Sequence, residues 1–132
     1  YIISSSLTGV LAQRLVRRIC PRCKGQVEPT KEELERLDLS EEQAAKIRFY
    51  KGRGCQYCRN TGYHGRVALY ELMVMNDELR EAIARGATAS ELRHIAIRTG
   101  MKTLKHDGIV KVHNGITTAS EVISVMFAAD VL

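Results

Sequence analysis

The pattern of apolar positions predicts a helix at the start of the chain. Apolar residues follow each other at intervals of three and four residues at Ile3, Leu7, Val10, Leu11 and Leu15. This spacing predicts a helix from the first residues to about Arg18, ended by Pro21. Because no capping residue precedes it, we expect the chain to be part of a longer protein. Arg14 falls on the apolar stripe, where it either packs its stem and solvates its head or contacts phosphate or a neighbouring subunit.

Two short helices and one strand are predicted in the middle of the chain. Thr30 with Glu33, and Ser40 with Gln43, have the spacing of capping boxes, so we expect a small helical hairpin. The apolar run over residues 66–75 predicts a largely buried strand. Since the chain offers almost no other strand pattern, we expect the partner strands of this segment to lie outside it.

From Asn76 onward the pattern is helical. Asn76 or Asp77, Thr88, Thr103 and Thr118 begin four helices, and Gly86, Gly100 and Gly115 end the first three. These helices predict a compact bundle, with core residues that include Met101, Met126 and Phe127. The histidines at 94, 106 and 113 lack mutual metal-ligand spacing, and we expect them to be solvated or to cap helices. The expected fold is therefore mainly α with little β.

Four cysteines form two hooks, Cys20-Pro21-Arg22-Cys23 and Cys55-Gln56-Tyr57-Cys58. Two Cys-x-x-Cys hooks separated by 31 residues have the spacing of a structural zinc site, in which each hook directs two thiolates at one ion. We expect one zinc ion held by Cys20, Cys23, Cys55 and Cys58. Two disulfides, a redox motif or four free thiols are the alternatives, and His64 is a further candidate ligand.

Composition adds a charge pattern to this picture. The chain of 132 residues carries a net charge of +5. Residues 14–24 and 48–66 each hold five basic side chains and no acidic one, whereas the segment between them is rich in acids. The basic residues therefore surround the hooks, where they offset the charge of about −2 of a zinc ion bound by four thiolates.

No catalytic constellation is visible in the sequence. A phosphate loop of the form GxxxxGK[ST] is absent, and the Gly52-x-Gly54 pair is too short to be one. Cysteines that bind a structural zinc ion are not free to serve as the catalytic nucleophile of an enzyme. The chain itself is thus predicted to be a binding or scaffolding module rather than an enzyme.

Several motifs together resemble one protein family. They are Gly9 to Arg17 leading into Cys20, the run from Gly54 to Arg66, Tyr70-Glu71-Leu72, Asp107-Gly108, and Gly115 to Thr118. The most specific is the Gly-Cys-x-x-Cys-x-x-Thr-Gly-Tyr-x-Gly-Arg run. With these motifs, essentially the whole chain resembles the C-terminal part of the ATPases that drive type II secretion and type IV pilus assembly, the general secretion pathway protein E family.

The resemblance implies a division of the chain. Residues 1–19 would be the last helix of a RecA-like α/β core, and residues 20–63 a tetracysteine zinc-binding subdomain with a helical hairpin. Residues 64–75 would be a strand returning to the core, and residues 76–132 a C-terminal helical subdomain. The ATP and magnesium sites would lie in the parent protein, upstream of Tyr1.

The resemblance also implies a cellular setting. The parent would be a homo-hexameric ATPase in the cytoplasm, peripheral to the inner membrane, that docks on an inner-membrane platform protein and other subunits of the machinery. The tetracysteine insert favours an assembly or secretion motor over a retraction motor, and the motifs do not separate assembly from secretion. The alternative functions are a nucleic-acid-binding zinc ribbon, which the net charge favours, and a structural zinc module of another protein.

Overall fold

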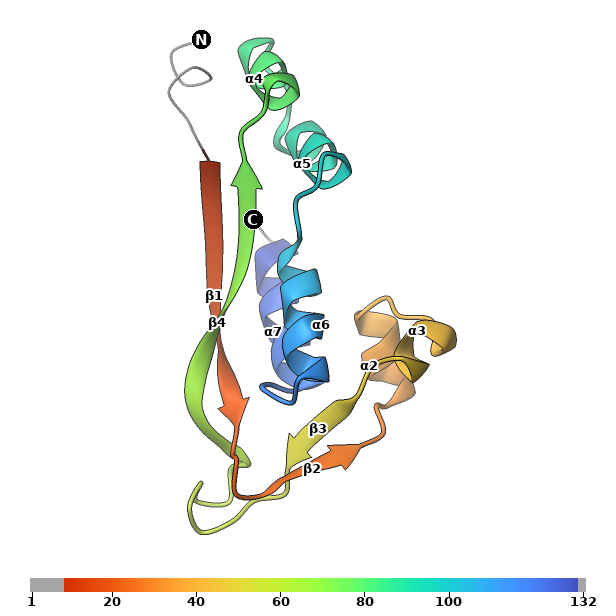
Figure 1. Ribbon diagram of the computed structural model, residues 1–132, viewed down its shortest axis with the longest axis vertical. Helices are drawn as coiled ribbons and strands as arrows, with labels where there is room; N and C mark the ends of the chain where they lie inside the picture. The colour runs from red at the N-terminus through yellow and green to blue at the C-terminus, as the bar shows by residue number, and fades with distance from the viewer. Residues whose placement is uncertain (1–8, 131–132) are drawn as a thin grey trace. The chain divides into compact units, whose positions relative to one another are not determined.

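The computed structural model describes residues 9–130, and side chains as far as residue 126. The described part of the chain forms ten elements, whose course can be followed in Figure 1. They are β1 (Gly9–Ile19), β2 (Lys24–Val27), α2 (Lys31–Arg36), α3 (Glu41–Ala45), β3 (Phe49–Gly52), β4 (Tyr63–Val74), α4 (Asp77–Ala84), α5 (Ala89–Arg98), α6 (Leu104–His113) and α7 (Ala119–Asp130). They belong to two compact units, which we describe separately. Among the described residues, unit 1 comprises 9–13 and Tyr70–Leu104, and unit 2 comprises Arg14–Leu69 and 105–130.

The expectation of a mainly α fold with little β is wrong. Two small antiparallel sheets are present, one of β1 and β4 and one of β2 and β3. The long strands β1 and β4 contain 11 and 12 residues. The expected helical bundle is also wrong, because α4 and α5 belong to unit 1 whereas nearly all of α6 and the whole described part of α7 belong to unit 2.

The first element is a strand where the apolar spacing predicted a helix. Residues 9–19 form β1, which pairs with β4, so the predicted strand over residues 66–75 finds its partner within this chain. The apolar side chains of β1 do not share one buried stripe: Val16 is 2% exposed, but Leu11 and Leu15 are 58% and 53% exposed. The pairing with a strand some fifty residues away overrides the local spacing. Ile3 and Leu7, which also carried the helix prediction, lie outside the described residues.

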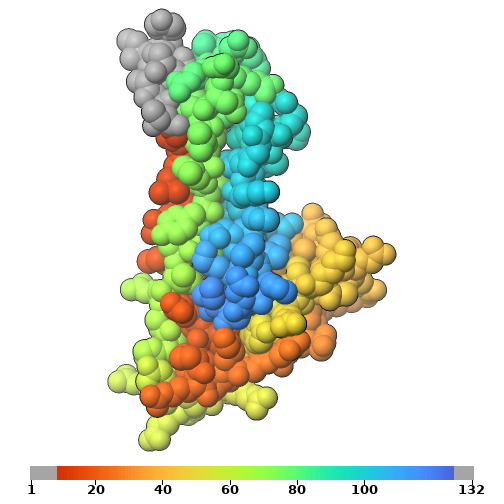
Figure 2. All heavy atoms as spheres, in the orientation of Figure 1, coloured from red at the N-terminus to blue at the C-terminus, as the bar shows by residue number. Residues whose placement is uncertain are grey.

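The two short helices predicted between the hooks are confirmed, and two paired strands flank them. Strands β2 and β3 pair antiparallel, with Lys24 opposite Gly52 and Val27 opposite Phe49. The side chains of Thr30 and Ser40 accept hydrogen bonds from the backbone N–H groups of Glu33 and Gln43, and both capping boxes are complete. The caps therefore begin α2 and α3 at the residues that the sequence indicated. In Figure 2 this segment of unit 2 is drawn as orange and yellow spheres.

Unit 1 has a small core between β4, α4 and α5. Met75, Leu79 and Ala96 are buried there, and the partly buried neighbours are Met73, Ile83, Leu92, Ile95 and Met101. Asn76 caps α4 by accepting a hydrogen bond from the N–H of Leu79, and Thr88 caps α5 in the same way through Glu91. Met101 thus occupies a core position as predicted, although this core contains only two of the four predicted helices.

In unit 2, α6 and α7 pack closely against each other. A Cβ atom added to Gly108 of α6 would lie 2.6 Å from Cγ1 of Val122, so the absence of a side chain permits this contact. Val112 and Val122 are buried, as are Thr117 and Thr118 just before α7. Met126 is partly buried, whereas the side chain of Phe127 lies outside the described residues.

Glu71 of β4 ties three segments of unit 1 together. Its carboxylate accepts hydrogen bonds from both terminal nitrogens of Arg93, at 2.8 and 3.2 Å, and from the backbone N–H of Leu104 at 2.9 Å. Burial opposes ionisation of Glu71, but these donors outweigh burial and hold its pKa below the ordinary value. The ionised carboxylate is therefore part of the fold.

Replacing Glu71 with Gln should destabilise unit 1 by about 1–2 kcal/mol at neutral pH, because the charged acceptor is lost. The stabilisation by Glu71 is present above the pKa of the unfolded state and disappears as the pH falls through the lower folded pKa. Denaturant unfolding at several pH values measures this, and the difference between the two proteins should vanish in acid. Glu81→Gln, at an exposed position of α4 in the same unit, is the control. An undiminished difference in acid would contradict the assignment.

Candidate metal centre

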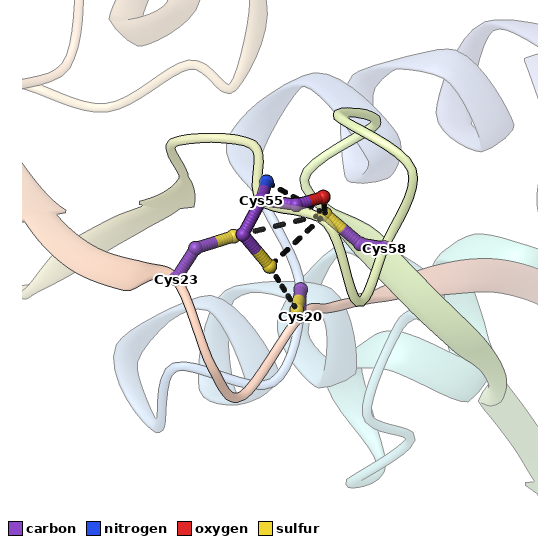
Figure 3. Close-up of side chains that lie close together, drawn as sticks. All are labelled: Cys20, Cys23, Cys55 and Cys58. Carbon is purple, nitrogen blue, oxygen red and sulfur yellow. Dashed lines mark hydrogen bonds between the residues drawn. The ribbon is translucent and has the colours of Figure 1, made fainter.

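Four cysteine sulfurs from the two hooks meet in unit 2. Cys20 and Cys23 follow β1, and Cys55 and Cys58 lie in the loop between β3 and β4, so the fold brings together residues 35 positions apart (Figure 3). The Sγ atoms are separated by 3.7 Å for Cys20 and Cys55, 3.8 Å for Cys23 and Cys58, and 3.7 Å for Cys55 and Cys58. All four lie within 4.8 Å of one another, so together they could hold a metal ion.

The separations fit a tetrahedral ion. With metal–sulfur bonds of about 2.3 Å, the edge of a regular tetrahedron is about 3.8 Å. The three separations of 3.7 or 3.8 Å match this edge. They are far longer than a disulfide bond of about 2.05 Å, and all four cysteines are free thiols. A tetrahedral set of four sulfurs suits zinc, and it also suits iron.

Two of the four sulfurs accept hydrogen bonds from backbone N–H groups. Sγ of Cys58 accepts from the N–H groups of Cys55 and Gly62, at 3.3 and 3.2 Å, and Sγ of Cys23 accepts from Gly54 at 3.3 Å. Burial disfavours the Cys58 thiolate, but its two N–H donors outweigh burial and lower the pKa to about 6. Burial raises the pKa of Cys23 to about 11, against the single donor from Gly54. The loop thus stabilises negative charge on Cys58 before any metal arrives.

Two glycines allow the hooks to approach each other. A Cβ atom added to Gly52 would lie 2.1 Å from the carbonyl oxygen of Gly62, and one added to Gly62, whose φ is +81°, would lie 2.7 Å from that of Gly52. The same Gly62 carbonyl accepts the N–H of Cys20 at 2.9 Å, and Cys23 accepts the N–H of Arg53 at 3.1 Å. The glycine-rich sequence around the second hook predicted tight backbone, but not that Gly52 and Gly62 would touch.

His64 does not join the sulfurs. In the described part of the chain the metal-capable group consists of the four cysteines alone. The His64 ring stacks on Tyr57, with centroids 4.4 Å apart, and the guanidinium of Arg22 lies 4.1 Å from the centroid of the same tyrosine ring. Arg22, Tyr57 and His64 are exposed, so the outer surface of the hooks is basic and aromatic. The remaining histidines stay apart from the site, and Nδ1 of His113 accepts the N–H of Arg48.

Contacts with α7 and with the connection between α6 and α7 hold the segments next to the hooks in place within unit 2. The guanidinium of Arg17 pairs with Glu121 at 3.1 Å and lies over the ring of Tyr63, whose hydroxyl meets that of Thr118 at 2.9 Å. The Lys24 ammonium donates to the carbonyl of Gly115 at 3.3 Å, just after α6. These pairings join residues about 50 to 100 positions apart, and the sequence did not indicate them.

Comparison with known proteins places the chain in a family. The family model described as "Type II/IV secretion system protein" matches residues 1–124. The chain belongs to the type II/IV secretion system protein family. The resemblance found in the sequence is thereby confirmed.

Relatives within the type II/IV secretion family are named either as pilus assembly ATPases or as secretion system ATPases. The type IV pilus assembly ATPase PilB of Thermus thermophilus is 53% identical over 122 residues, which cover 92% of this chain and 14% of that protein. PilB of Myxococcus xanthus is 40% identical over 124 residues, or 93% of this chain and 22% of that protein. The type II secretion system ATPase E of Vibrio cholerae is 41% identical over 127 residues, or 95% and 24%.

The chain therefore spans between about one seventh and one quarter of the length of these family members. Within the part of the chain that the structure describes, none of the helices has both the length and the apolar character needed to cross a membrane.

Proposed function

We propose that this chain is the metal-stabilised, partner-docking part of a motor ATPase that powers type IV pilus assembly or type II secretion. The family membership of residues 1–124 is the observation that carries the proposal. Relatives named as pilus assembly ATPases and as secretion ATPases support the same motor class. Within the motor, residues 20–63 form the metal-binding subdomain, flanked by the segments 1–19, 64–75 and 76–132.

The metal is zinc, held by Cys20, Cys23, Cys55 and Cys58 in a structural role. The sulfur separations of 3.7 and 3.8 Å and the set of four thiolates support this assignment. Little apolar surface anchors α2 and α3, since Leu37 and Phe49 are the only buried apolar residues among the described positions 24–54. Binding of structural zinc supplies on the order of 10 kcal/mol in small modules, which offsets this deficit.

The reduced chain should bind one zinc ion, with metal binding coupled to folding of the hook region. Elemental analysis of the purified chain gives the stoichiometry, and circular dichroism during titration with a chelator reports the coupled unfolding. Iron in place of zinc at full occupancy would contradict the choice of metal. A well-ordered hook region with far less than one metal ion per chain would contradict the structural role.

The isolated chain should neither bind ATP tightly nor hydrolyse it, because its 132 residues contain no GxxxxGK[ST] loop to hold the phosphates. A phosphate-release assay and calorimetric titration with ATP measure this, with the full-length motor as the positive control. Turnover that disappears when a residue of this chain is replaced would overturn the division of labour that we propose.

The basic surface around the hooks is the docking site for other parts of the machinery. Arg22, with Tyr57 and His64 stacked beside it, and the exposed Arg53 and Arg59 supply charge and planar groups that recognise carboxylates. We infer that this surface contacts the cytoplasmic part of the inner-membrane platform protein, with the motor acting as a homo-hexamer at the cytoplasmic face of that membrane. A charge-reversed Arg22→Glu motor should lose binding to the platform protein while it keeps its metal.

A further inference from the structure

The four sulfurs differ in how well the chain protects them. Cys20 and Cys58 are buried, whereas Cys23 and Cys55 are partly exposed. Cys58 accepts two backbone N–H groups and Cys23 accepts one. Among the described residues, no N–H group donates to the sulfur of Cys55 or of Cys20. Cys55 is therefore the only one of the four that combines partial exposure with a sulfur that receives no N–H donor.

These two properties decide which thiolate reacts with an oxidant. An N–H···S hydrogen bond draws negative charge away from the sulfur and makes it a weaker nucleophile, also when the sulfur is bound to a metal. Oxidation of cysteine follows thiolate character and access. The sulfur of Cys20 receives no N–H donor, but Cys20 is buried and an oxidant cannot reach it easily. Cys23 is partly exposed, but its sulfur already accepts one N–H group.

We propose that Cys55 is an oxidation site for hydroperoxides, and that its conversion to a disulfide with Cys20 releases the metal. This rests on the proposed function, in which the four cysteines hold zinc. The site would make the metal-dependent part of the motor sensitive to peroxide, and thiol reductants would restore it.

Formation of the disulfide requires two cysteine thiolates and one molecule of hydroperoxide. The Cys55 thiolate attacks one oxygen of hydrogen peroxide, so an S–O bond forms, the O–O bond breaks, and hydroxide leaves. A second thiolate then attacks the sulfur of the sulfenic acid, so an S–S bond forms and a second hydroxide leaves. The two sulfurs together lose two electrons, which reduce the peroxide.

The geometry points to Cys20 as the second sulfur. Cys20 and Cys58 both lie 3.7 Å from Cys55, but Cys58 carries two N–H donors and Cys20 carries none. The more nucleophilic neighbour is therefore Cys20, and the disulfide joins the two hooks. Because the two remaining thiolates, Cys23 and Cys58, complete only half of a tetrahedral zinc site, the ion is lost.

The test uses the zinc-loaded chain, with the zinc content measured first. Hydrogen peroxide is added in steps while a chromophoric chelator reports zinc release and a dimedone probe traps sulfenic acid. Mass spectrometry of alkylated peptides then identifies the first oxidised residue and the disulfide. We expect label on Cys55 first, a Cys20–Cys55 disulfide in step with zinc release, and recovery of zinc binding after reduction.

A matched pair of variants isolates the role of Cys55. Cys55→His leaves three cysteines and one histidine, a ligand set that structural zinc accepts. Gln56→His introduces the same residue at the exposed neighbouring position and leaves all four cysteines in place. Release of zinc by peroxide should be about tenfold slower in Cys55→His than in the wild type, and within about twofold of the wild type in Gln56→His.

First oxidation at Cys23 or Cys58, or zinc release without a disulfide that contains Cys55, would overturn the proposal while leaving the zinc site intact. A chain that carries no zinc before peroxide is added would instead refute the proposed metal role, and with it this inference. Peptide mapping of the wild-type chain decides the question even where a histidine variant fails to bind zinc.

Discussion

Replacing Cys58 with Ser in the full-length motor is expected to abolish pilus assembly or secretion while a measurable basal ATPase activity remains. Serine is a poor zinc ligand at neutral pH because its hydroxyl stays protonated. The substitution also removes the acceptor of the N–H groups of Cys55 and Gly62. Loss of the ion costs on the order of 10 kcal/mol of apparent binding energy, so the hook region loses its anchor.

The phosphate-binding groups lie outside this chain in our proposal, which is why hydrolysis should survive. The measurement is paired: ATPase rate and zinc content of the purified protein, and piliation or secretion in cells. Gln56→Ser is the matched control, because it introduces the same residue at an exposed position of the same hook. Full function in cells with zinc-free Cys58→Ser protein would contradict the docking role.

Replacing Gly52 with Ala should destabilise unit 2 by at least about 3 kcal/mol and weaken metal binding, although residue 52 is not a ligand. The new Cβ atom would lie 2.1 Å from the carbonyl oxygen of Gly62, so the backbone itself must move. Gly62 also donates its N–H to Cys58 and accepts the N–H of Cys20. A shift there therefore displaces one cysteine of each hook.

The matched control is Gly86→Ala in unit 1. Gly86 has a φ of +80° but no atom within 4 Å of an added Cβ, so alanine there meets only the conformational cost of about 1 kcal/mol. Denaturant unfolding and competition with a zinc chelator measure both variants. Equal zinc affinity in the Gly52→Ala protein and the wild type would show that the close approach of Gly52 to Gly62 does not position the sulfurs.

The sequence predicted best those features that depend only on residues close together in the chain. The caps at Thr30, Ser40, Asn76 and Thr88 are confirmed, because a side chain that bonds an N–H group three residues away needs no partner elsewhere. The two hooks were likewise visible as local motifs, and the structure brings all four sulfurs together. The zinc ion itself stays a prediction.

The prediction of a helix for the first element was wrong for the opposite reason, because its structure depends on a distant partner. Whether residues 9–19 form a helix or a strand depends on β4, which lies far along the chain. Local spacing carries no information about that pairing. The same holds for the contact of Gly52 with Gly62 and for the ion pair of Arg17 with Glu121, which joins residues 104 positions apart. Sequence patterns alone indicate which kinds of residue stand at these positions, but not which distant residues they contact.

The hairpin between the hooks is closed at its base by the pairing of β2 with β3 and by the sulfur cluster beyond it. The entropy lost on closing a loop grows only with the logarithm of its length, so doubling the segment costs about 0.6 kcal/mol. Lengthening the exposed connection between α2 and α3 therefore carries almost no loop-closure penalty. Natural variation in length should accumulate there, and a foreign peptide or small domain inserted near Asp38, an exposed residue with a φ of 55° between α2 and α3, should leave the metal centre intact.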